Sequence, residues 1–412
     1  MNNMVEIGSL PPVGEVPKKM FAQVIRQDRF GDPRSAFQIE EIDIPAVKPH
    51  EVLIGTMAAG INFNNVWAAR GIPIDVIRVR QKMGEPYDFH IGGSDISGII
   101  YAIGSEVHNL SVGDEVVVHH GYWDPDDPWI KVGKDPMTAP SAQIWGYNTN
   151  FGSFGQFSIA QAHAVLPKAT HLTWEEAAAP TLVGTTAYRM LFGWEGNVLK
   201  EGDVVLVWGG SGGLGSQAIQ LAAVHGARAV AVVSDNERGE FCKRLGAVGY
   251  INRNHFSHWG VPPHWTDAVG QKEWLKGCRG FGKAIWDVLG EKRNPDIVFE
   301  HPGENTMPTS IFVCEAGGMV VICAGTTGYS AMVDLRYHWV RQKRLQGSHG
   351  SNDKQAQAYN QLVCDKKIDP CLGEIYKFED IGKAHYDMEQ GKTVFGNRVA
   401  LVGAPTIGMG SH

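Results

Sequence analysis

Six residues near the middle of the chain have the spacing of a dinucleotide-binding loop: Gly210-Ser211-Gly212-Gly213-Leu214-Gly215. The apolar run VVLVW precedes them, and the helical pattern SQAIQLAAVHGA follows. In this context the first glycine allows a tight turn, the second lets the backbone approach a pyrophosphate, and the third lets the helix pack closely. The helix N-terminus then faces the anion. We expect all six residues to bind a dinucleotide, the alternative being a glycine-rich turn without a ligand.

The residues at the end of the next strand indicate whether the ribose of that dinucleotide carries a 2′-phosphate. They are Val233-Ser234-Asp235-Asn236-Glu237-Arg238. Asp235 could accept hydrogen bonds from the free 2′-hydroxyl of NAD, whereas Ser234 and Arg238 suit the 2′-phosphate of NADP. We expect NADP(H), bound by Ser234 and Arg238, and leave open that Arg238 is an exposed cation at a helix start. Thr185, on the preceding helix, is placed either to meet the nicotinamide end of the cofactor or to pack inside the helix.

Metal ligands are missing where a zinc dehydrogenase would need them. The first half of the chain has no cysteine, and the place for a His-Glu pair reads Gly92-Gly93-Ser94-Asp95. His119 and His120 are neighbours in a predicted strand, so their side chains point to opposite faces. We expect no metal. Without a Lewis acid to polarise a carbonyl, hydride addition to an activated alkene is favoured over alcohol oxidation.

The elements that must position these residues fall into two patterns. Short alternating strands with Pro and Gly punctuation run to about residue 170 and predict a partly closed β-domain. Thr173, followed by Trp174, Glu175 and Glu176, predicts a helix start. From about 191 to 349 the strand–helix alternation predicts a doubly wound parallel Rossmann sheet. We therefore expect an α/β chain with residues 191–349 as the dinucleotide domain, inserted into a substrate domain made of 1–190 and 350–412.

Composition narrows the function classes. A chain of 412 residues that is 43% hydrophobic can bury two cores, and a net charge of −7 with no block of like charges longer than a few residues excludes a nucleic-acid or membrane-surface protein. No stretch of eighteen apolar residues predicts a membrane span. The six cysteines, all in the second half, lie far apart and are expected to be reduced. We expect a cytoplasmic enzyme.

Several long stretches resemble the crotonyl-CoA carboxylase/reductase family, within the zinc-free medium-chain dehydrogenases/reductases. The likeness spans nearly the whole chain and rests on GINFNNVW at 60–67, IWGY at 144–147 with GSF at 152–154, LTWEEAA at 172–178, DIVFEHPG at 296–303, and RQKR at 341–344 with GSH at 347–349. The resemblance implies a GroES-like catalytic domain beside the Rossmann domain. It also implies NADPH-dependent hydride addition to the β-carbon of an enoyl-CoA and attack of the resulting enolate on CO2, giving an alkylmalonyl-CoA.

The resemblance further implies which side chains hold CO2. They are Asn64, Gln156 and His349, with Phe154 beside them to exclude water. An Asn amide can donate to a CO2 oxygen, and His and Gln can hold a water against the other oxygen. Read from the residues alone, Asn64 could satisfy backbone groups in a turn, Gln156 could be an outward-facing strand residue, and His349 could be a structural histidine.

In the family, basic and aromatic side chains bind the adenine and phosphates of CoA, and the matching candidates here are Arg336, Tyr337, Arg341, Lys343 and Arg344. An uncovered cationic surface is the alternative. Three departures stand out. Cys314-Glu315-Ala316 replaces a basic pair before a Gly-Gly turn, which puts tight binding of the CoA 3′-phosphate in doubt, and Gly155 and Gly350 replace larger residues, which predicts a looser pocket.

Other functions stay open on sequence alone. A plain enoyl-CoA reductase would protonate the enolate, a quinone or enone reductase would not need the cationic cluster at 336–344, and a sensor would bind NADPH without catalysis. The resemblance suggests a homodimer or homotetramer formed through the Rossmann sheets.

Overall fold

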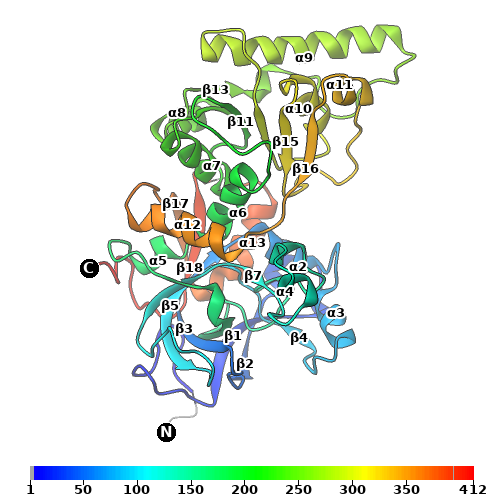
Figure 1. Cartoon of the computed structure of the whole chain (residues 1–412). Coiled ribbons are helices and arrows are strands. Elements are labelled where there is room, and N and C mark those ends of the chain that lie inside the picture. Colours follow the sequence, from blue (N-terminus) through cyan, green and yellow to red (C-terminus); the bar gives the residue numbers. More distant parts are fainter. Residues whose placement is uncertain (1–3, 393) are drawn as a thin grey trace. The chain divides into compact units, whose positions relative to one another are not determined.

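The computed structural model describes residues 4–392 and 394–412 and divides the chain into two compact units. Unit 1 contains residues 1–185 and 350–412, and unit 2 contains residues 186–349. The sequence places the first boundary at 190 and the second at the junction of 349 and 350. Figure 1 shows the strands and helices of the chain, many of them labelled.

Unit 1 is built on a mixed sheet in the order β10-β6-β5-β3-β18-β17, with β9 also paired to β3, and its pairs are antiparallel except for the parallel pair β17 and β18. Its strands are β1 (Lys19–Arg26), β2 (Gln38–Asp43), β3 (Glu51–Ile61), β4 (Phe89–His90), β5 (Ile96–Ile103), β6 (Glu115–Val118), β7 (Gly121–Tyr122), β8 (Gln143–Ile144), β9 (Phe157–Gln161), β10 (Val165–Pro167), β17 (Leu372–Tyr376) and β18 (Asn397–Leu401). Its helices are α1 (Pro33–Ala36), α2 (Phe63–Arg70), α3 (Val76–Lys82), α4 (Pro128–Lys131), α5 (Trp174–Ala177), α12 (Asp353–Cys364) and α13 (Ile381–Glu389), and α6 (Thr181–Phe192) begins in it.

Strand β3 is the centre of unit 1, because every one of its residues is buried and it pairs with β5, β9 and β18. The pairing with β18 brings the C-terminal part of the chain into the same sheet as the N-terminal part. Gly60, near the end of β3, has no room for a side chain, since a Cβ there would lie 2.6 Å from both the Ala178 carbonyl oxygen and Asp95 Cβ. The end of strand β3 therefore packs directly against Asp95, just before α2 begins.

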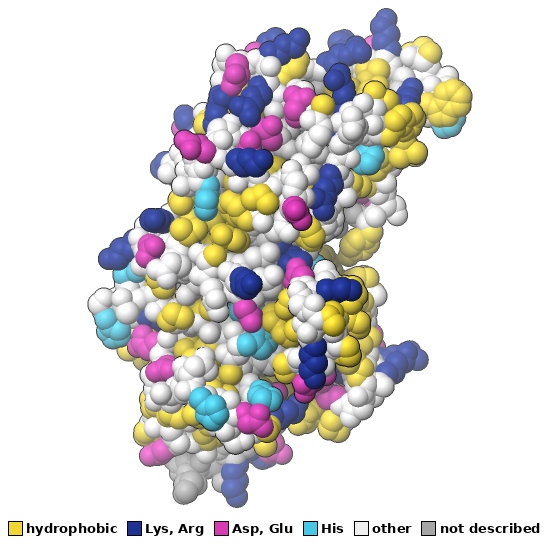
Figure 2. Space-filling view, in the orientation of Figure 1, with side chains coloured by type: hydrophobic (Ala, Val, Ile, Leu, Met, Phe, Trp, Pro, Cys, Tyr) yellow, Lys and Arg dark blue, Asp and Glu magenta, His cyan; other side chains and the backbone are white. Residues whose placement is uncertain are grey.

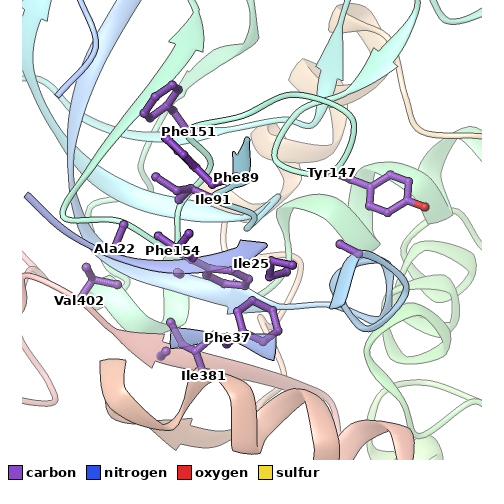
Figure 3. Packing of buried hydrophobic residues seen from close by; sticks show 14 of the residues in the cluster. Ala22, Ile25, Phe37, Phe89, Ile91, Tyr147, Phe151, Phe154, Ile381 and Val402 are labelled. Atoms are coloured by element: carbon purple, nitrogen blue, oxygen red, sulfur yellow. The ribbon is translucent and has the colours of Figure 1, made fainter. Parts of the chain in front are cut away.

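The larger core of unit 1 lies between β1, the 151–157 segment and helix α13. Figure 3 shows Phe154 beside Phe37 and Ile25, with Ile381 of α13 below them. The Phe154 ring is fully buried and makes an edge contact with Phe37 at 5.9 Å between ring centroids. Aromatic burial of this kind is among the strongest contributions to a core.

Helices α5 and α6 replace the single helix that the sequence predicts from Thr173 onward. The predicted start is confirmed, since Thr173 and Glu176 form a reciprocal capping box at α5. The helix then stops at Ala177, and Pro180 precedes the new helix α6. A proline disfavours helical backbone in the residue before it, which accounts for the break.

Unit 2 carries six parallel strands in the order β13-β12-β11-β14-β15-β16. These are β11 (Val204–Trp208), β12 (Arg228–Val233), β13 (Gly249–Asn252), β14 (Ile297–Glu300), β15 (Met319–Ile322) and β16 (Arg344–Gly347), and the helices are α7 (Gly213–Val224), α8 (Asn236–Arg244), α9 (Ala268–Leu289), α10 (Met307–Val313) and α11 (Leu335–Trp339). Strand β11 is buried throughout, as a strand covered on both faces should be. The α/β fold class with a parallel Rossmann sheet is confirmed.

Two further properties bear on function. All six cysteines are free thiols, and four of them are buried. Among the described residues, no helix has the length and apolar character needed to cross a bilayer.

Candidate active site

The loop at residues 92–95 gathers three segments that are far apart in the sequence, all within unit 1. Its Gly92 and Gly93 carbonyls accept hydrogen bonds from the backbone amides of Phe154 and Ser153, each at 3.0 Å. On its other side, the Gly93 amide donates to Asn65 Oδ1 at 3.3 Å. The loop thus connects the start of α2 with the 152–154 segment.

Asn64 lies at this junction with its amide held from two sides. Its Nδ2 donates to Ser94 Oγ at 2.9 Å, and its Oδ1 accepts from Asn65 Nδ2 at 3.0 Å. An amide nitrogen carries two hydrogens, and among the described residues the second one has no recorded acceptor. Asn64 is half-buried, whereas Asn65 is fully buried. The arrangement presents one oriented N–H donor to a ligand.

Asp95 ties the same loop to helix α6. Its Oδ2 accepts from Asn62 Nδ2 at 2.8 Å, and its Oδ1 accepts from the Leu182 backbone amide at 2.6 Å. Asn62 precedes α2 but does not cap it with its side chain, because that side chain is directed to Asp95 instead. Burial raises the pKa of the Asp95 carboxyl well above its ordinary value, although both hydrogen bonds oppose that shift.

Gln156 has a different environment from the one its proposed role requires. Its Oε1 accepts from the Phe21 amide at 2.9 Å, and its Nε2 donates to the carbonyls of Glu6 and Ser9 at 2.9 and 3.2 Å. The side chain is 1% exposed, so the alternative of an outward-facing strand residue is wrong. None of these contacts involves the 92–95 loop. The amide anchors the N-terminal segment to strand β1, and this geometry does not support a pocket role for it.

Phe154 supports the loop from the core side. A Cβ on Gly93 would lie 2.9 Å from Phe154 Cδ1, so the ring packs directly beneath that glycine. Its other neighbours are apolar or aromatic, including His385 at 5.3 Å between ring centroids. Thr185 likewise turns inward, because its hydroxyl donates to the Thr181 carbonyl at 2.7 Å within α6. This hydrogen bond fits the second interpretation of Thr185, in which the residue packs inside the helix.

His349 ends unit 2, two residues after strand β16, and its side chain is exposed. The next residue, Gly350, has φ +62°, a left-handed conformation that favours glycine. A Cβ at this position would lie 2.6 Å from Met137 Cε and 2.9 Å from His120 Nε2. The expectation that Gly350 loosens a pocket is therefore wrong, since its neighbours already fill the space of a side chain.

The dinucleotide loop of unit 2 has the geometry that its glycines predict. Gly212 is the N-cap of α7, and the backbone there has open space around the position of a Cβ, with only the Gly209 oxygen at 3.5 Å. A Cβ on Gly215 would lie 2.4 Å from that same oxygen and 2.7 Å from Gly210 Cα. The third glycine therefore permits the close helix packing, and the second leaves space in front of the helix N-terminus.

Ser234, Asp235 and Arg238 lie together at the end of β12. Asp235 caps α8 by accepting from the Arg238 amide at 2.9 Å, and its Oδ2 also accepts from Ser234 Oγ and Arg238 Nε, each at 3.0 Å. The guanidinium reaches across to Ser211 Oγ in the glycine loop at 3.1 Å. The Asp235 carboxylate is thus engaged by Ser234 and Arg238, although its side chain is 49% exposed and that of Arg238 is 12% exposed.

The cationic cluster at 336–344 is only partly available to a ligand. Lys343 Nζ is buried and donates to the carbonyls of Ile311 and Phe312, at 2.5 and 3.1 Å, at the end of α10. Arg344 donates to the Glu195 carbonyl at 2.8 Å, and Arg336 is paired with Asp334. Arg341 is exposed, with no ion pair recorded among the described residues. This geometry does not support a phosphate contact for Lys343.

Tyr337 packs edge-on against Phe312 at 5.0 Å between ring centroids, which places the ring within the protein surface rather than free of it. Cys314, at the departure from the family pattern, is buried, and burial raises the pKa of its thiol to about 12. Neither residue is a free binding group in this structure.

Comparisons with known proteins find matches for both parts of the chain. A family model described as the alcohol dehydrogenase GroES-like domain matches residues 48–170, and one described as zinc-binding dehydrogenase matches residues 213–364. The crotonyl-CoA carboxylase/reductase of Cereibacter sphaeroides is 49% identical over 407 residues, covering 99% of this chain and 93% of that protein. The chain belongs to the crotonyl-CoA carboxylase/reductase family.

A further relative and two solved structures are similar to nearly the whole chain. A crotonyl-CoA reductase of Streptomyces avermitilis is 38% identical, over 90% of this chain and 83% of its own length. Among solved structures, the crotonyl-CoA carboxylase/reductase AntE in complex with NADP is 50% identical, with a TM-score of 0.94 over 98% of this chain and 100% of that one. The 2-octenoyl-CoA carboxylase reductase CinF, in complex with NADP and 2-octenoyl-CoA, is 34% identical, with a TM-score of 0.87 over 96% and 90%.

The zinc implied by one family description does not fit the residues at 92–95. The Ser94 hydroxyl is bonded to the Asn64 amide, and both Asp95 oxygens accept N–H groups. Within residues 4–392 and 394–412, one group of three ligand-type side chains comes close together, namely His119, His163 and Asp353, and it includes no residue of this loop. We therefore derive no catalytic step through a metal ion.

Glu300 is a buried carboxyl that the sequence does not single out, although it lies in the DIVFEHPG stretch of this family. It ends strand β14 and accepts from Thr306 Oγ1 at 2.6 Å, Ser310 Oγ at 2.5 Å and the Gly303 amide at 3.1 Å. Burial raises its pKa from 4.5 to about 7, against these hydrogen bonds, which favour the charged form. The Gly303 loop at the end of the parallel sheet is thereby fixed.

A raised carboxyl pKa makes unfolding depend on pH in a defined direction. Between pH 4.5 and about 7 the folded state holds the proton that the unfolded state releases. The free energy of unfolding should therefore fall as pH rises through this window, by at most about 1.4 kcal/mol per pH unit. We expect Glu300→Gln to lose this part of the pH dependence, measured by urea unfolding at pH 5, 6 and 7. Identical slopes for the two proteins would contradict the assignment.

Proposed function

We propose that this protein is an NADPH-dependent enoyl-CoA carboxylase/reductase acting on crotonyl-CoA or a related short enoyl-CoA. Bound NADPH supplies a hydride to the β-carbon of the substrate. The electron pair of the double bond then forms an enolate, whose α-carbon attacks the carbon of CO2, and the products are an alkylmalonyl-CoA and NADP⁺. The observation that carries this proposal is the oriented, half-buried Asn64 amide, one N–H of which has no acceptor among the residues that the structure describes.

Each part of the chain has a task in this reaction. Asn64 donates to a CO2 oxygen, which stabilises the negative charge that develops there as the carbon–carbon bond forms. Phe154 closes the core side of the 92–95 loop against water, which would otherwise protonate the enolate. His349 is assigned to CO2 on the family resemblance alone. Arg341 and Arg336 are the cations best placed by exposure to meet CoA phosphates.

The deciding experiment measures NADPH oxidation with crotonyl-CoA, with and without bicarbonate plus carbonic anhydrase, and identifies the products by mass spectrometry. Ethylmalonyl-CoA as the main product supports the proposal. Butyryl-CoA alone under saturating CO2 would leave a plain reductase, the second candidate, which gains weight from relatives named crotonyl-CoA reductase.

Arg238 gives a test of the cofactor. Its guanidinium, bonded to Asp235 and Ser211, is positioned for a 2′-phosphate. A charge-assisted hydrogen bond contributes about 1.5–3 kcal/mol, so Arg238→Gln should raise the KM for NADPH by roughly 10- to 100-fold. The KM for NADH should change little. Lys243→Gln is the control, because it removes an exposed cation of the same helix, one that pairs with Glu240. Equal effects on both cofactors would contradict the role of Arg238.

Assembly and location are also proposals. Strand β16 is an edge of the parallel sheet, and Leu335, Trp339 and Val340, which precede it in the chain, are 60%, 60% and 63% exposed. Figure 2 shows hydrophobic side chains gathered on the surface over α11. An open strand edge and exposed apolar residues in the same unit suit pairing with a second copy. We expect a homodimer or larger homo-oligomer by sedimentation, and the free thiols fit the expected cytoplasmic location.

A further inference from the structure

The direction of the Asn64 side-chain amide decides whether an N–H group or an oxygen faces a ligand. Ser94 Oγ, which lies 2.9 Å from Asn64 Nδ2, cannot fix that direction, because a hydroxyl both donates and accepts. The neighbouring Asn65 can fix it. Its Nδ2 donates to Asn64 Oδ1 at 3.0 Å, so the oxygen of Asn64 faces Asn65 and the nitrogen faces Ser94 and the ligand.

Asn65 must itself be held in one direction for this to work. It lies in the first turn of α2 and is fully buried. Its Oδ1 accepts from the Gly93 backbone amide at 3.3 Å, which is a long hydrogen bond. An amide keeps its shape when oxygen and nitrogen are exchanged, so one long bond holds its direction weakly. A second donor beside Oδ1 would make the direction definite.

His90, the last residue of β4, lies beside that oxygen. A Cβ placed on Gly92 would be 2.0 Å from Asn65 Oδ1 and 3.2 Å from His90 Nε2, so both atoms border the same point of the loop backbone. The imidazole is fully buried, and its Nε2 has no hydrogen-bond partner among the residues that the structure describes. If this nitrogen carries the ring proton, it favours an oxygen beside it and opposes an NH2 group.

Arg80, in helix α3, decides which nitrogen of His90 carries the proton. Its Nη1 lies 2.9 Å from His90 Nδ1, and a guanidinium donates but cannot accept, so Nδ1 is the acceptor. Burial and the charge of Arg80 lower the pKa of the His90 ring well below its ordinary value, so the ring is neutral and its proton lies on Nε2. Arg80 is also anchored, because it donates to the Phe89 carbonyl at 2.8 Å and to Glu85 at 3.1 Å.

We propose that Asn65 is a positioning residue that turns an N–H of Asn64 toward CO2, and that the Nε2–H of His90 holds Asn65 in the required direction. The sequence of donors begins at Arg80, whose side chain can only donate, and passes through His90 and Asn65 to Asn64. All four residues belong to unit 1. This inference rests on the proposed function, because it takes Asn64 as the residue that binds CO2.

The first test removes the amide of Asn65 from the full-length enzyme. Asn65→Leu keeps the branched skeleton but neither donates nor accepts, and Asn65→Ala is a second route to the same loss if the leucine variant does not fold. Asn360→Leu is the matched control, because it removes another buried amide, one that donates to the Pro167 carbonyl at 3.0 Å. For each protein we measure the melting temperature, the rate of NADPH oxidation, and the ratio of ethylmalonyl-CoA to butyryl-CoA as CO2 is varied.

We expect both Asn65 variants to show a product ratio lowered by about tenfold and a raised KM for CO2, because a misplaced orienting group can cost up to about 100-fold in rate. NADPH oxidation should stay within about threefold of the wild type, since hydride transfer does not use the Asn64 amide. Asn360→Leu should keep the wild-type ratio even if its melting temperature falls as far. A wild-type ratio in a folded Asn65 variant would overturn the inference.

A second pair of variants tests the part played by His90. Glutamine can accept from Arg80 through Oε1 and donate onward through Nε2, as His90 does, whereas leucine can do neither. We expect His90→Gln to keep the product ratio within about threefold of the wild type and His90→Leu to lower it about as far as Asn65→Ala. Equal ratios in the two variants would remove His90 from the sequence of donors. A wild-type enzyme that makes only butyryl-CoA would instead show that the proposed function itself fails.

Discussion

Gly215→Ala should abolish tight NADPH binding and lower stability, whereas Gly212→Ala should affect binding alone. A methyl group at residue 215 would lie 2.4 Å from the Gly209 oxygen and 2.7 Å from Gly210 Cα, both of them backbone atoms that cannot turn aside. Helix α7 must then move away from strand β11. Overpacking of this kind typically costs about 1–3 kcal/mol, and the displaced loop loses the amides that face the pyrophosphate.

Gly212 is the matched control within the same loop. Its φ of −82° and ψ of 175° are accessible to alanine, and the position of a Cβ has only one neighbour, at 3.5 Å. Alanine there should leave the melting temperature unchanged or slightly higher, because it restricts the unfolded chain. The methyl group would still stand where a pyrophosphate approaches the N-terminus of α7, so the Kd for NADPH should rise about tenfold or more.

Fluorescence titration with NADPH and thermal unfolding of both variants check this pair. We expect Gly215→Ala to lose at least about 100-fold in affinity together with stability, since both the cradle and the packing are disturbed. If Gly212→Ala lost as much stability as Gly215→Ala, the distinction between the two glycines would be wrong. If neither variant changed the affinity, the loop would not be the pyrophosphate site.

The features that could be predicted from the sequence are those with local causes. The buried strand at 204–208 and the glycine loop after it lie within one short stretch. The strand is predicted by its run of apolar residues, and the loop by its glycines and the helical pattern that follows. The helix start at Trp174 follows from a capping box that spans four residues. The missing cysteines and the Gly-Gly-Ser-Asp loop were likewise visible without any structure.

The roles that could not be predicted depend on partners far away in the chain. Gln156 is anchored by carbonyls about 150 positions earlier, and Lys343 by carbonyls about 30 positions earlier. A backbone carbonyl has no side-chain signature, so sequence patterns do not show which polar residue it will bind. Both residues therefore resembled ligand-binding groups while serving as internal anchors.

For the same reason, the contacts of Ser94 and Asp353 could not be predicted from the sequence. Ser94 orients Asn64 across thirty positions, and Asp353 meets His119 and His163 across more than 180. Each of these residues is unremarkable in its own segment. Ser94 meets the start of α2, and Asp353 meets histidines that follow β6 and β9, so both contacts depend on how distant segments of unit 1 come together.

Asn64→Leu should convert the enzyme from carboxylation toward simple reduction. Leucine has the same branched side-chain skeleton as asparagine but donates no hydrogen bond, so the CO2 oxygen would lose its partner as charge develops on it. Loss of one such donor typically costs about 100- to 1,000-fold in rate. Because hydride transfer precedes this step, crotonyl-CoA should still be consumed with NADPH, and protonation of the enolate should give butyryl-CoA.

Ser94→Ala provides a graded comparison, because it removes the hydroxyl that orients the Asn64 amide at 2.9 Å while leaving the amide in place. A donor that is present but less well held should retain part of its effect. We therefore expect the ratio of ethylmalonyl-CoA to butyryl-CoA, measured by mass spectrometry under saturating CO2, to fall from wild type through Ser94→Ala to Asn64→Leu. A wild-type ratio in Asn64→Leu would remove this amide from the carboxylation step, and the half-buried N–H would then have only a structural role at the start of α2.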